Sequence, residues 1–441
     1  MEFGVTVITR QDVEALSTRL KEPRWLTDRR LASFARQAEL PVPGRENEEY
    51  RRTDLRRLDL GRFRLPADDS RPGRPPRRAV KRARDDAGSL TQVGDRTEYA
   101  ELSADAAAQG VIFCSLSEAV AKYPDKVRPY FEDARIGADE DKWSALNGAL
   151  WSGGAFLFVP SGVEVALPLR SSFVHAGIDE ALFSRTVVVA DAWSSVTYID
   201  DYSSAGDGLT AAALHAGVVD VVAGEGAAIR YNHIQNLGRN VWNFTRERVF
   251  ARRDSGVNLL QVALGSASTK AFVHAHLDEP GANTELLGVI FASGTQHIDH
   301  STLQNHRVGQ TLSDLLFKCA LLDRSRSVYS GLIAIHPNAQ RSDAYQNNRN
   351  LLLSRAVRAD SIPMLEILAN DVRCTHGSTS SSVDEEELFY LQSRGLARDQ
   401  AERLIVEGFF ANVLERIPLA TVRGRLEEAI EAKIAEMGVA A

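Results

Sequence analysis

The chain has 441 residues, of which 44% are hydrophobic and 25% are charged, and its formal net charge is -7. This is the composition of an ordinary soluble protein, and the acidic balance gives no general reason to expect nucleic-acid binding. A chain of this length exceeds one compact core, so we expect two or three structural regions.

The sequence carries no evident targeting or membrane segment. Its start, MEFGVTVITRQDVEAL, lacks a basic run followed by a long apolar core. No run approaches the roughly 20 apolar residues that a membrane span requires. The three cysteines, Cys114, Cys319 and Cys374, show no C-x-x-C spacing, so neither a disulfide framework nor a self-contained zinc site is implied. We therefore expect a cytoplasmic protein.

Residues 1–150 are predicted to form a mainly helical amino-terminal region. Apolar residues recur at helical spacing over residues 10–20 and 25–38. In the second of these helices Leu31, Phe34 and Ala38 share a face. The stretch at about 66–88 is rich in Pro, Gly and Arg, which is typical of a flexible linker or surface loop. Because no aromatic residues are interleaved with its basic residues, a solvated loop is favoured over a contact with nucleic acid or an acidic partner.

Residues 151–380 have a different pattern, that of a strand-rich core. Short runs of Val, Ile, Leu and Phe recur between Gly, Asn, Asp and Ser, and no long helical pattern separates them. Examples are AFLFV, TVVVA, AGVVDVVA, VNLLQVAL and ELLGVIF. More than 200 residues of this kind are too many for one sandwich or small barrel. Stacked coils would bury the apolar faces, so we predict a right-handed parallel β-helix, a mainly β solenoid.

Six of the ten histidines lie in one stretch of this core, between His233 and His306. His274 and His276 share a strand face, and His297 and His300 follow closely, so a divalent-metal site is conceivable. A ladder of scattered imidazoles on strand surfaces is the favoured interpretation, and we assign no metal here. The chain also lacks G-x-S-x-G, a dinucleotide G-x-G-x-x-G at a strand-to-helix junction and any Gly-Lys dipeptide. If nucleotide hydrolysis accompanies the function of this protein, another chain would thus perform it.

Residues 381–441 are predicted to form a carboxy-terminal helical subdomain. Asp384 and Glu387 form a capping-box-like start, and two further helices are expected over residues 398–415 and 419–437. Apolar stripes of this kind normally bury against each other or against the solenoid.

A thiol and an imidazole precede these helices. The extended segment Val372–His376 places Cys374 and His376 on one face by period-two alternation, with Arg373 on the other. A neighbouring cation lowers the pKa of a thiol, so the pair could bind sulfur or iron. Iron-sulfur clusters and structural zinc usually take four protein ligands, so two side chains require a second contributor. The structural alternative is a small buried cysteine and a turn histidine.

The surrounding sequence resembles a known family. DAYQNNRNLLLS, ADSIP-x-LEI-x-A-x-DV-x-C-T-H-G-S-T and DEEELFYLQSRG are similar, in order and spacing, to motifs of the SufB/SufD family of the SUF iron-sulfur assembly system. The resemblance extends from about Trp143 to Pro418. It is weaker at Glu49–Asp54, which looks like the E-x-W-R-Y-T-D box of the family but departs from it at Tyr50 and Arg52. The resemblance implies a β-helical core, in agreement with the strand pattern.

Within the family, the chain resembles the SufD members. SufB members carry T-x-C-D-S-L-L, with a cysteine that receives sulfur or anchors the nascent cluster, and Asn348 stands at that place here. An amide cannot carry a persulfide. The resemblance implies a non-enzymatic scaffold subunit that joins SufB and the ATPase SufC in a SufBCD complex. His376 would be a nascent-cluster ligand or a base, and Cys374 a secondary thiol ligand.

The same resemblance implies further partners and cofactors. The carboxy-terminal helices would dock SufC, with Glu407, Phe409 and Phe410 as candidate contacts. The iron-sulfur cluster would be transient and present only in the complex, and the resemblance leaves open whether FAD binds there. Two other functions stay open, namely a SufB-like homodimeric cluster scaffold and a carbohydrate-active β-helix enzyme. An unpaired strand edge near the C-x-H segment also permits a homodimer of the isolated chain.

Overall fold

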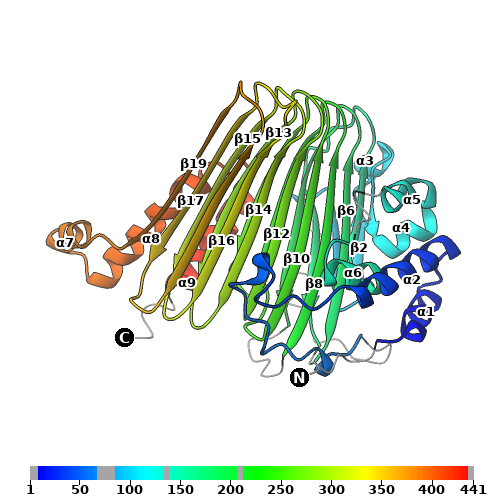
Figure 1. Cartoon of the computed structure of the whole chain (residues 1–441), viewed down its shortest axis with the longest axis horizontal. Helices are drawn as coiled ribbons and strands as arrows, with labels where there is room; N and C mark the ends of the chain where they lie inside the picture. The colour runs from blue at the N-terminus through cyan, green and yellow to red at the C-terminus, as the bar shows by residue number, and fades with distance from the viewer. Residues whose placement is uncertain are drawn as a thin grey trace.

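Two parallel sheets form the centre of the molecule in the computed structural model, which describes residues 8–66, 85–133, 135, 139–177, 179–205 and 212–435. In that part of the chain the sheets have ten and nine strands, and consecutive strands from β4 onward alternate between them. Each coil therefore adds one strand to each sheet. The predicted mainly β solenoid is confirmed (Figure 1).

The first, odd-numbered sheet contains the odd-numbered strands except β3, together with β2, and the second, even-numbered sheet contains the remaining even-numbered strands and β3. The first sheet consists of β19 (Arg373–Ser382), β17 (Asp343–Leu352), β15 (Leu312–Leu321), β13 (Asn283–Ala292), β11 (Gly256–Ala263), β9 (Ala228–Asn236), β7 (Ser195–Ser204), β5 (Leu169–His175), β1 (Gly88–Val93) and β2 (Arg96–Leu102), in spatial order. The second consists of β18 (Arg358–Ile367), β16 (Arg326–Ile335), β14 (His297–His306), β12 (Ser268–Leu277), β10 (Val241–Ala251), β8 (Ala213–Ala223), β6 (Ala181–Ala190), β4 (Ala155–Val159) and β3 (Ile112–Ser115).

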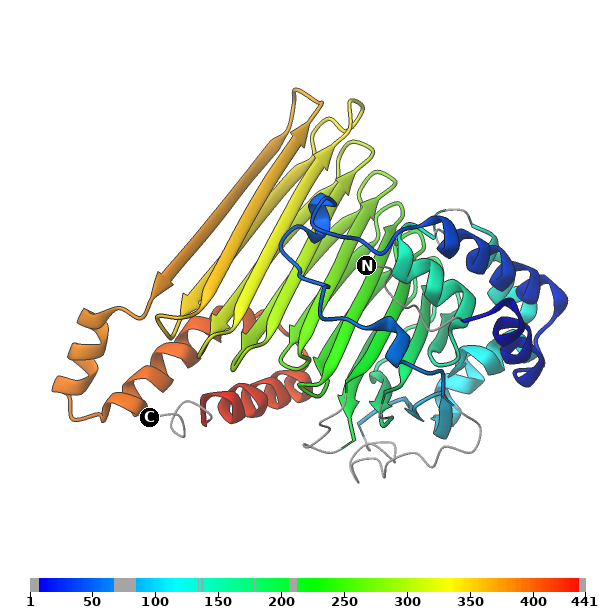
Figure 2. The same cartoon turned by 60° about the horizontal axis from the view of Figure 1, so that its bottom comes forward.

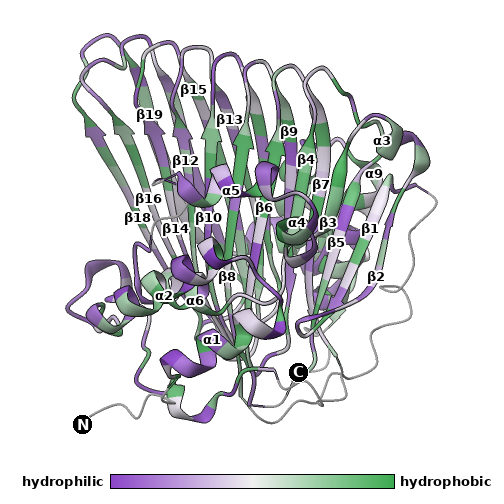
Figure 3. Ribbon diagram, turned by 90° about the vertical axis from the view of Figure 1, so that its right-hand side faces the viewer, coloured by the Kyte–Doolittle hydropathy of each residue, from purple (hydrophilic) through white to green (hydrophobic). Residues whose placement is uncertain are grey.

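The core lies between the two sheets because alternate residues of each strand point inward. In parallel pairing, equivalent residues of successive coils stack in columns, such as Leu259, Leu286 and Leu315. All three are buried in the main apolar cluster. Figure 3 shows this pattern as green segments on the strands and purple segments on many turns.

One row of turns continues the hydrogen-bond ladder beyond the strands. Successive coils place a residue with positive φ in it, including Trp193 (59°), Asp254 (52°) and Gln310 (62°). The Trp193 amide donates to the carbonyl of Glu225 at 2.7 Å, and the Gln310 amide donates to that of Gln340 at 2.9 Å. Gly226 must be glycine here, because a Cβ would lie 2.3 Å from the Trp193 ring. Backbone hydrogen bonds thus link each of these turns to the equivalent turn of the next coil.

The amino-terminal region packs on the outer face of the even-numbered sheet. Its helices are α1 (Arg10–Arg19), α2 (Arg24–Glu39), η1 (Glu48–Tyr50), η2 (Leu60–Arg62), α3 (Ala104–Ala108), α4 (Leu116–Lys122), α5 (Pro124–Glu132) and α6 (Lys142–Leu150). Leu26, Trp151 and Phe183 share its apolar cluster. The region predicted as mainly helical also contains β1, β2 and β3, which belong to the sheets. Most of the predicted linker, residues 67–84, lies outside the described chain.

The buried face of α2 follows the predicted pattern only in part, since Leu31 and Phe34 are partly buried against the apolar cluster. Leu26, Arg30 and Ser33 are buried, whereas Ala38 is exposed. The Arg30 guanidinium enters the core because Glu22 neutralises it at 2.6 Å and the carbonyl of Trp151 accepts from it at 2.8 Å.

The carboxy-terminal helices α7 (Glu385–Ser393), α8 (Arg398–Leu414) and α9 (Ala420–Ala435) follow the last strand. Figure 2 shows α8 and α9 running back along the solenoid. Phe410 and Ile430 pack with Leu287 and Phe291 on the outer face of the odd-numbered sheet. None of the helices in the described residues is long and apolar enough to cross a membrane.

The two ends of the solenoid are different. At the amino-terminal end, β2 is antiparallel to β1 and β3 is antiparallel to β4. At the other end, β18 and β19 are the last strands of their sheets, and no described strand pairs with their outer edges. No residue of β18 or β19 is buried, and we call this exposed last coil the open end of the solenoid.

Candidate functional site at the open end of the solenoid

Cys374 and His376 both lie on β19, in the last coil. In the parallel register Cys374 pairs with Ala344 and His376 with Gln346, and both of these partners are buried inside the coil. The two side chains therefore belong to the inward-facing rows, as the alternation predicts that they share one face. Because no further coil covers them, Cys374 is half-buried and His376 is exposed.

The environment of Cys374 does not favour its thiolate. Burial raises the pKa of the thiol, and the charge of Asp343 raises it further. Cys374 also packs beside an apolar cluster that includes Ile335 and Ala344. Arg373 lies on the opposite strand face, so the expected help from a neighbouring cation is wrong for this thiol in the isolated chain. A metal ion or a cation that arrives from outside would favour the thiolate.

Exposed apolar side chains lie on the last strand of the other sheet. Four large hydrophobic residues at the end of β18 are more than a third exposed, namely Met364, Leu365, Ile367 and Leu368. An unpaired strand edge beside exposed apolar side chains is a typical template for pairing with another chain. The open end thus combines an association surface with two potential metal ligands.

Asn348, at the position where SufB members carry a cysteine, is buried on β17, in the coil before the one that carries Cys374 and His376. Its side-chain oxygen accepts from the Ser361 hydroxyl and from the Asn350 amide at 3.1 Å. Its own amide donates to the carbonyl of Phe317 at 3.5 Å. Asn348 therefore has a structural role in holding β17 to β18, and it offers no nucleophile.

A groove lies where β19 passes into α7 and α8. Its lining combines apolar side chains, including Leu351, Tyr390, Leu404 and Phe409, with the carboxylates of residues 384–387. Phe389 and Tyr390 beside it are 73% and 57% exposed. Sequence reasoning missed these aromatics, although their place directly after an acidic run was a usable signal.

The predicted docking residues on α8 are placed differently from one another. Phe409 lines the groove, and Glu407 forms an ion pair with Arg403 at 2.8 Å on the surface. Phe410 is fully buried against Phe291, so it cannot be a direct contact of a partner. The physical reason is that consecutive residues of a helix point in different directions. Phe410 points to the sheet, and Phe409 points partly away from it.

The six core histidines do not gather into one site. His233 and His300 are inside the coil, whereas His276 is on the outer face, where it stacks on Phe250. Burial lowers the pKa of His233 to about 3 and that of His300 to about 4, so these imidazoles are neutral. No group of three or more His, Cys, Asp or Glu side chains suited to a metal ion occurs within the described ranges.

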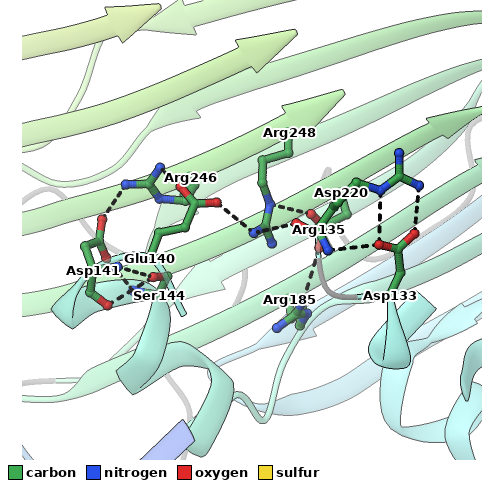
Figure 4. A network of polar contacts seen from close by, with 9 residues as sticks. All are labelled: Asp133, Arg135, Glu140, Asp141, Ser144, Arg185, Asp220, Arg246 and Arg248. Atoms are coloured by element: carbon green, nitrogen blue, oxygen red, sulfur yellow. Dashed lines mark hydrogen bonds and ion pairs between the residues drawn. The ribbon is translucent and has the colours of Figure 1, made fainter. Parts of the chain in front are cut away.

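A buried ionic network attaches the amino-terminal region to the solenoid (Figure 4). Arg246 on β10 bridges Glu140 and Asp141 at 2.5 and 2.6 Å. Arg248 binds Asp220 on β8 at 2.8 Å and Glu140 at 3.1 Å. Sequence reasoning did not identify this network. Its only signal was the R-E-R triplet within an otherwise apolar strand.

These features define a class of protein: a β-solenoid that exposes a thiol, an imidazole and an unpaired strand edge at one end, with an acidic and aromatic groove on adjoining helices. The model of the SUF system FeS cluster assembly, SufBD core domain matches residues 173–409, and the model of the SufBD protein N-terminal region matches residues 14–170. The chain belongs to the SufB/SufD family of iron-sulfur cluster assembly proteins.

Several curated relatives span nearly the whole chain. The iron-sulfur cluster assembly protein SufD of Bacillus subtilis is 29% identical over 98% of this chain and 100% of its own length. The iron-sulfur cluster assembly protein SufB of the same organism is 27% identical over 93% of this chain and 90% of its own. An iron-sulfur cluster assembly SufBD family protein of Staphylococcus epidermidis is also 27% identical. The alternative of a carbohydrate-active enzyme finds no support among these matches.

Proposed function

We propose that this chain is a SufD-type, non-catalytic scaffold subunit that contributes half of a cluster-assembly site at the interface with a SufB-type partner. The observation that carries the proposal is the position of half-buried Cys374 and exposed His376 in the last coil, next to an unpaired strand edge. A thiol and an imidazole are two of the four ligands that a cluster usually takes, so the partner would supply the others.

In this proposal the two ligands have unequal roles. Because burial raises the pKa of Cys374, its thiol is the secondary ligand, and binding of iron would favour its deprotonation. His376 is exposed, and a neutral imidazole binds iron or accepts a proton from the thiol of a partner. The primary sulfur acceptor would be a cysteine of the SufB-type subunit, since Asn348 cannot carry sulfur.

We also propose that the groove between β19, α7 and α8 docks the ATPase SufC. Exposed Phe389 and Tyr390 supply aromatic anchors, and the acidic residues 384–387 favour a basic partner surface. Of the residues predicted for this role, Phe409 and Glu407 remain candidates. Motion of the ATPase would be transmitted through α8, which packs on the odd-numbered sheet.

The nascent cluster is the cargo of this site. The groove is a poor site for FAD. Its carboxylates would repel the pyrophosphate, and the described residues offer no glycine-rich phosphate loop there. The residues of this groove therefore do not fit FAD, and no step is assigned to it.

The test is coexpression with SufB and SufC from one organism, followed by measurement of iron, sulfide and visible absorbance in the purified complex. We expect His376→Ala to lose most of the cluster content and Cys374→Ala to lose a smaller part. His336→Ala is the matched control, because His336 is also an exposed histidine but lies on a turn after β16. Full cluster content in His376→Ala would refute the proposed half-site.

The second candidate is a SufB-like homodimeric scaffold, which the 27% identity to SufB of Bacillus subtilis favours. The two functions make opposite predictions for the chain purified alone. A homodimeric scaffold would hold a cluster after iron and sulfide are supplied anaerobically, whereas the SufD-type subunit would not. Docking is tested separately by binding of SufC to Phe389→Asp, with Leu167→Asp as an exposed leucine control on a distant turn.

A further inference from the structure

Gln346 is an unusual residue for its place in the coil. Its column contains Leu259, Leu286 and Leu315 in three preceding coils, all buried and all apolar. Gln346 continues this column on β17, and His376 follows it on β19. The change from leucine to an amide thus occurs in the coil directly beneath the imidazole.

The amide of Gln346 has one free acceptor. Its Nε2 donates to the carbonyl of Gly331 at 3.4 Å, which orients the group. Its Oε1 is buried and has no hydrogen-bond partner among the residues described. A Cβ at Gly331 would lie 2.4 Å from Gln346 Nε2, so that glycine makes room for the amide. An unpaired buried acceptor lowers stability, because it has lost its hydrogen bonds to water, and such a group calls for an explanation.

We propose that Gln346 is the positioning residue of His376, with its Oε1 accepting a hydrogen bond from His376 Nδ1–H. Parallel register places both side chains in the same inward column on neighbouring strands. His376 is exposed, so rotation of its side chain brings Nδ1 onto the free oxygen. This inference rests on the proposed role of His376 as a ligand or base.

The hydrogen bond would determine which nitrogen faces the partner. Nδ1 is the ring nitrogen nearer the backbone and so the one within reach of a neighbouring strand. With Nδ1 protonated and bound to Gln346, the lone pair of Nε2 points out of the open end, available to iron or to a proton. Histidines that bind metals commonly donate their other ring nitrogen to an acceptor in this way.

The test measures the tautomer of His376 by nitrogen-15 NMR of the full chain labelled at histidine, with its signals assigned by their loss in His376→Asn. We expect the Nδ1–H tautomer to predominate, and its ratio to the Nε2–H tautomer to fall roughly fivefold in Gln346→Met. Gln346→Glu keeps an acceptor oxygen and should restore the Nδ1–H preference. Gln304→Met is the matched control, since Gln304 also has a buried, unpartnered Oε1 but does not pair with β19.

An unchanged tautomer ratio in Gln346→Met would overturn the inference, provided circular dichroism shows the native fold. If that variant does not fold, Gln346→Glu decides, because a carboxylate at this place must shift the ratio further toward Nδ1–H. The outcome is distinct from that of the proposed function. If Gln346→Met changes the tautomer ratio but His376→Ala retains full cluster content, the hydrogen bond is supported and the half-site is refuted. If the ratio is unchanged and His376→Ala loses the cluster, only the role of Gln346 is refuted.

Discussion

Arg248 binds Asp220 at 2.8 Å with both side chains almost fully buried on the outer face of the even-numbered sheet. Asp220 also accepts from Arg185 at 3.2 Å, and burial lowers the pKa of that guanidinium to about 10. One carboxylate thus compensates two buried cations beneath the amino-terminal region.

Removal of this carboxylate is expected to be strongly destabilising. Asp220→Asn keeps the side-chain shape but leaves Arg185 and Arg248 without this anion, so we expect a loss of about 3–5 kcal/mol in the free energy of unfolding. Urea denaturation measures it. Glu407→Gln breaks an exposed ion pair with Arg403 and should cost less than about 1 kcal/mol. Equal losses in the two variants would contradict the assigned role of Asp220.

Buried histidines make the fold sensitive to acid. Burial lowers the pKa of His215 to about 4. The unfolded chain takes up a proton at this imidazole below about pH 6.5, and the folded chain does so only near pH 4. His215 therefore contributes a loss of stability as the pH falls through this window. We expect His215→Gln to lose less stability than the wild type between pH 7.5 and 5, by on the order of 1 kcal/mol. Urea midpoints that fall by the same amount with pH in the two proteins would argue against this.

A buried carboxyl has the opposite pH dependence. Burial raises the pKa of Glu247 to about 8, and its Oε1 lies 3.3 Å from His233 Nδ1. The folded chain keeps this proton up to about pH 8, whereas the unfolded chain loses it near pH 4.5, so stability falls as the pH rises between these values. Gln at this position imitates the protonated acid. The melting temperature of Glu247→Gln should change less than that of the wild type between pH 6 and 8.5. A steeper pH dependence in the variant would count against this prediction.

The open end is expected to support self-association of the isolated chain. Leu368 is 58% exposed next to the unpaired edge of β18. We expect Leu368→Glu to shift sedimentation from dimer to monomer, because a charge there opposes burial of the apolar surface. Leu167→Glu, an exposed leucine before β5, should sediment like the wild type. A wild-type chain that stays monomeric at high concentration would contradict this prediction.

Much of the fold could be predicted from apolar periodicity, because most strands carry their own alternation and turn residues. The strands β1 and β2 could not, since GSLTQV and RTEYAEL are polar and depend on pairing with each other and with β5. Arg30 was missed for a related reason. A pattern of apolar residues assigns a charged side chain to the surface, and only the tertiary structure shows Glu22 and two carbonyls around it.

The candidate site was predictable only in part. Alternation correctly put Cys374 and His376 on one face, but it could not tell the inner face of a coil from the outer. That distinction comes from the register with Ala344 and Gln346. The docking prediction mixed Phe409 with Phe410 because consecutive apolar residues on a helix leave open which one meets the sheet. The burial of Phe410 resolves this.

The unequal ends of the solenoid have a consequence for the size of an assembly built through the open end. A stack with two unpaired ends could add copies without limit and form a fibre. Here the amino-terminal end finishes in antiparallel strands, and β2 carries charged residues such as Arg96 and Glu98. If copies join only through their carboxy-terminal coils, each chain uses its single coil of this kind in the first contact, and association would stop at a pair.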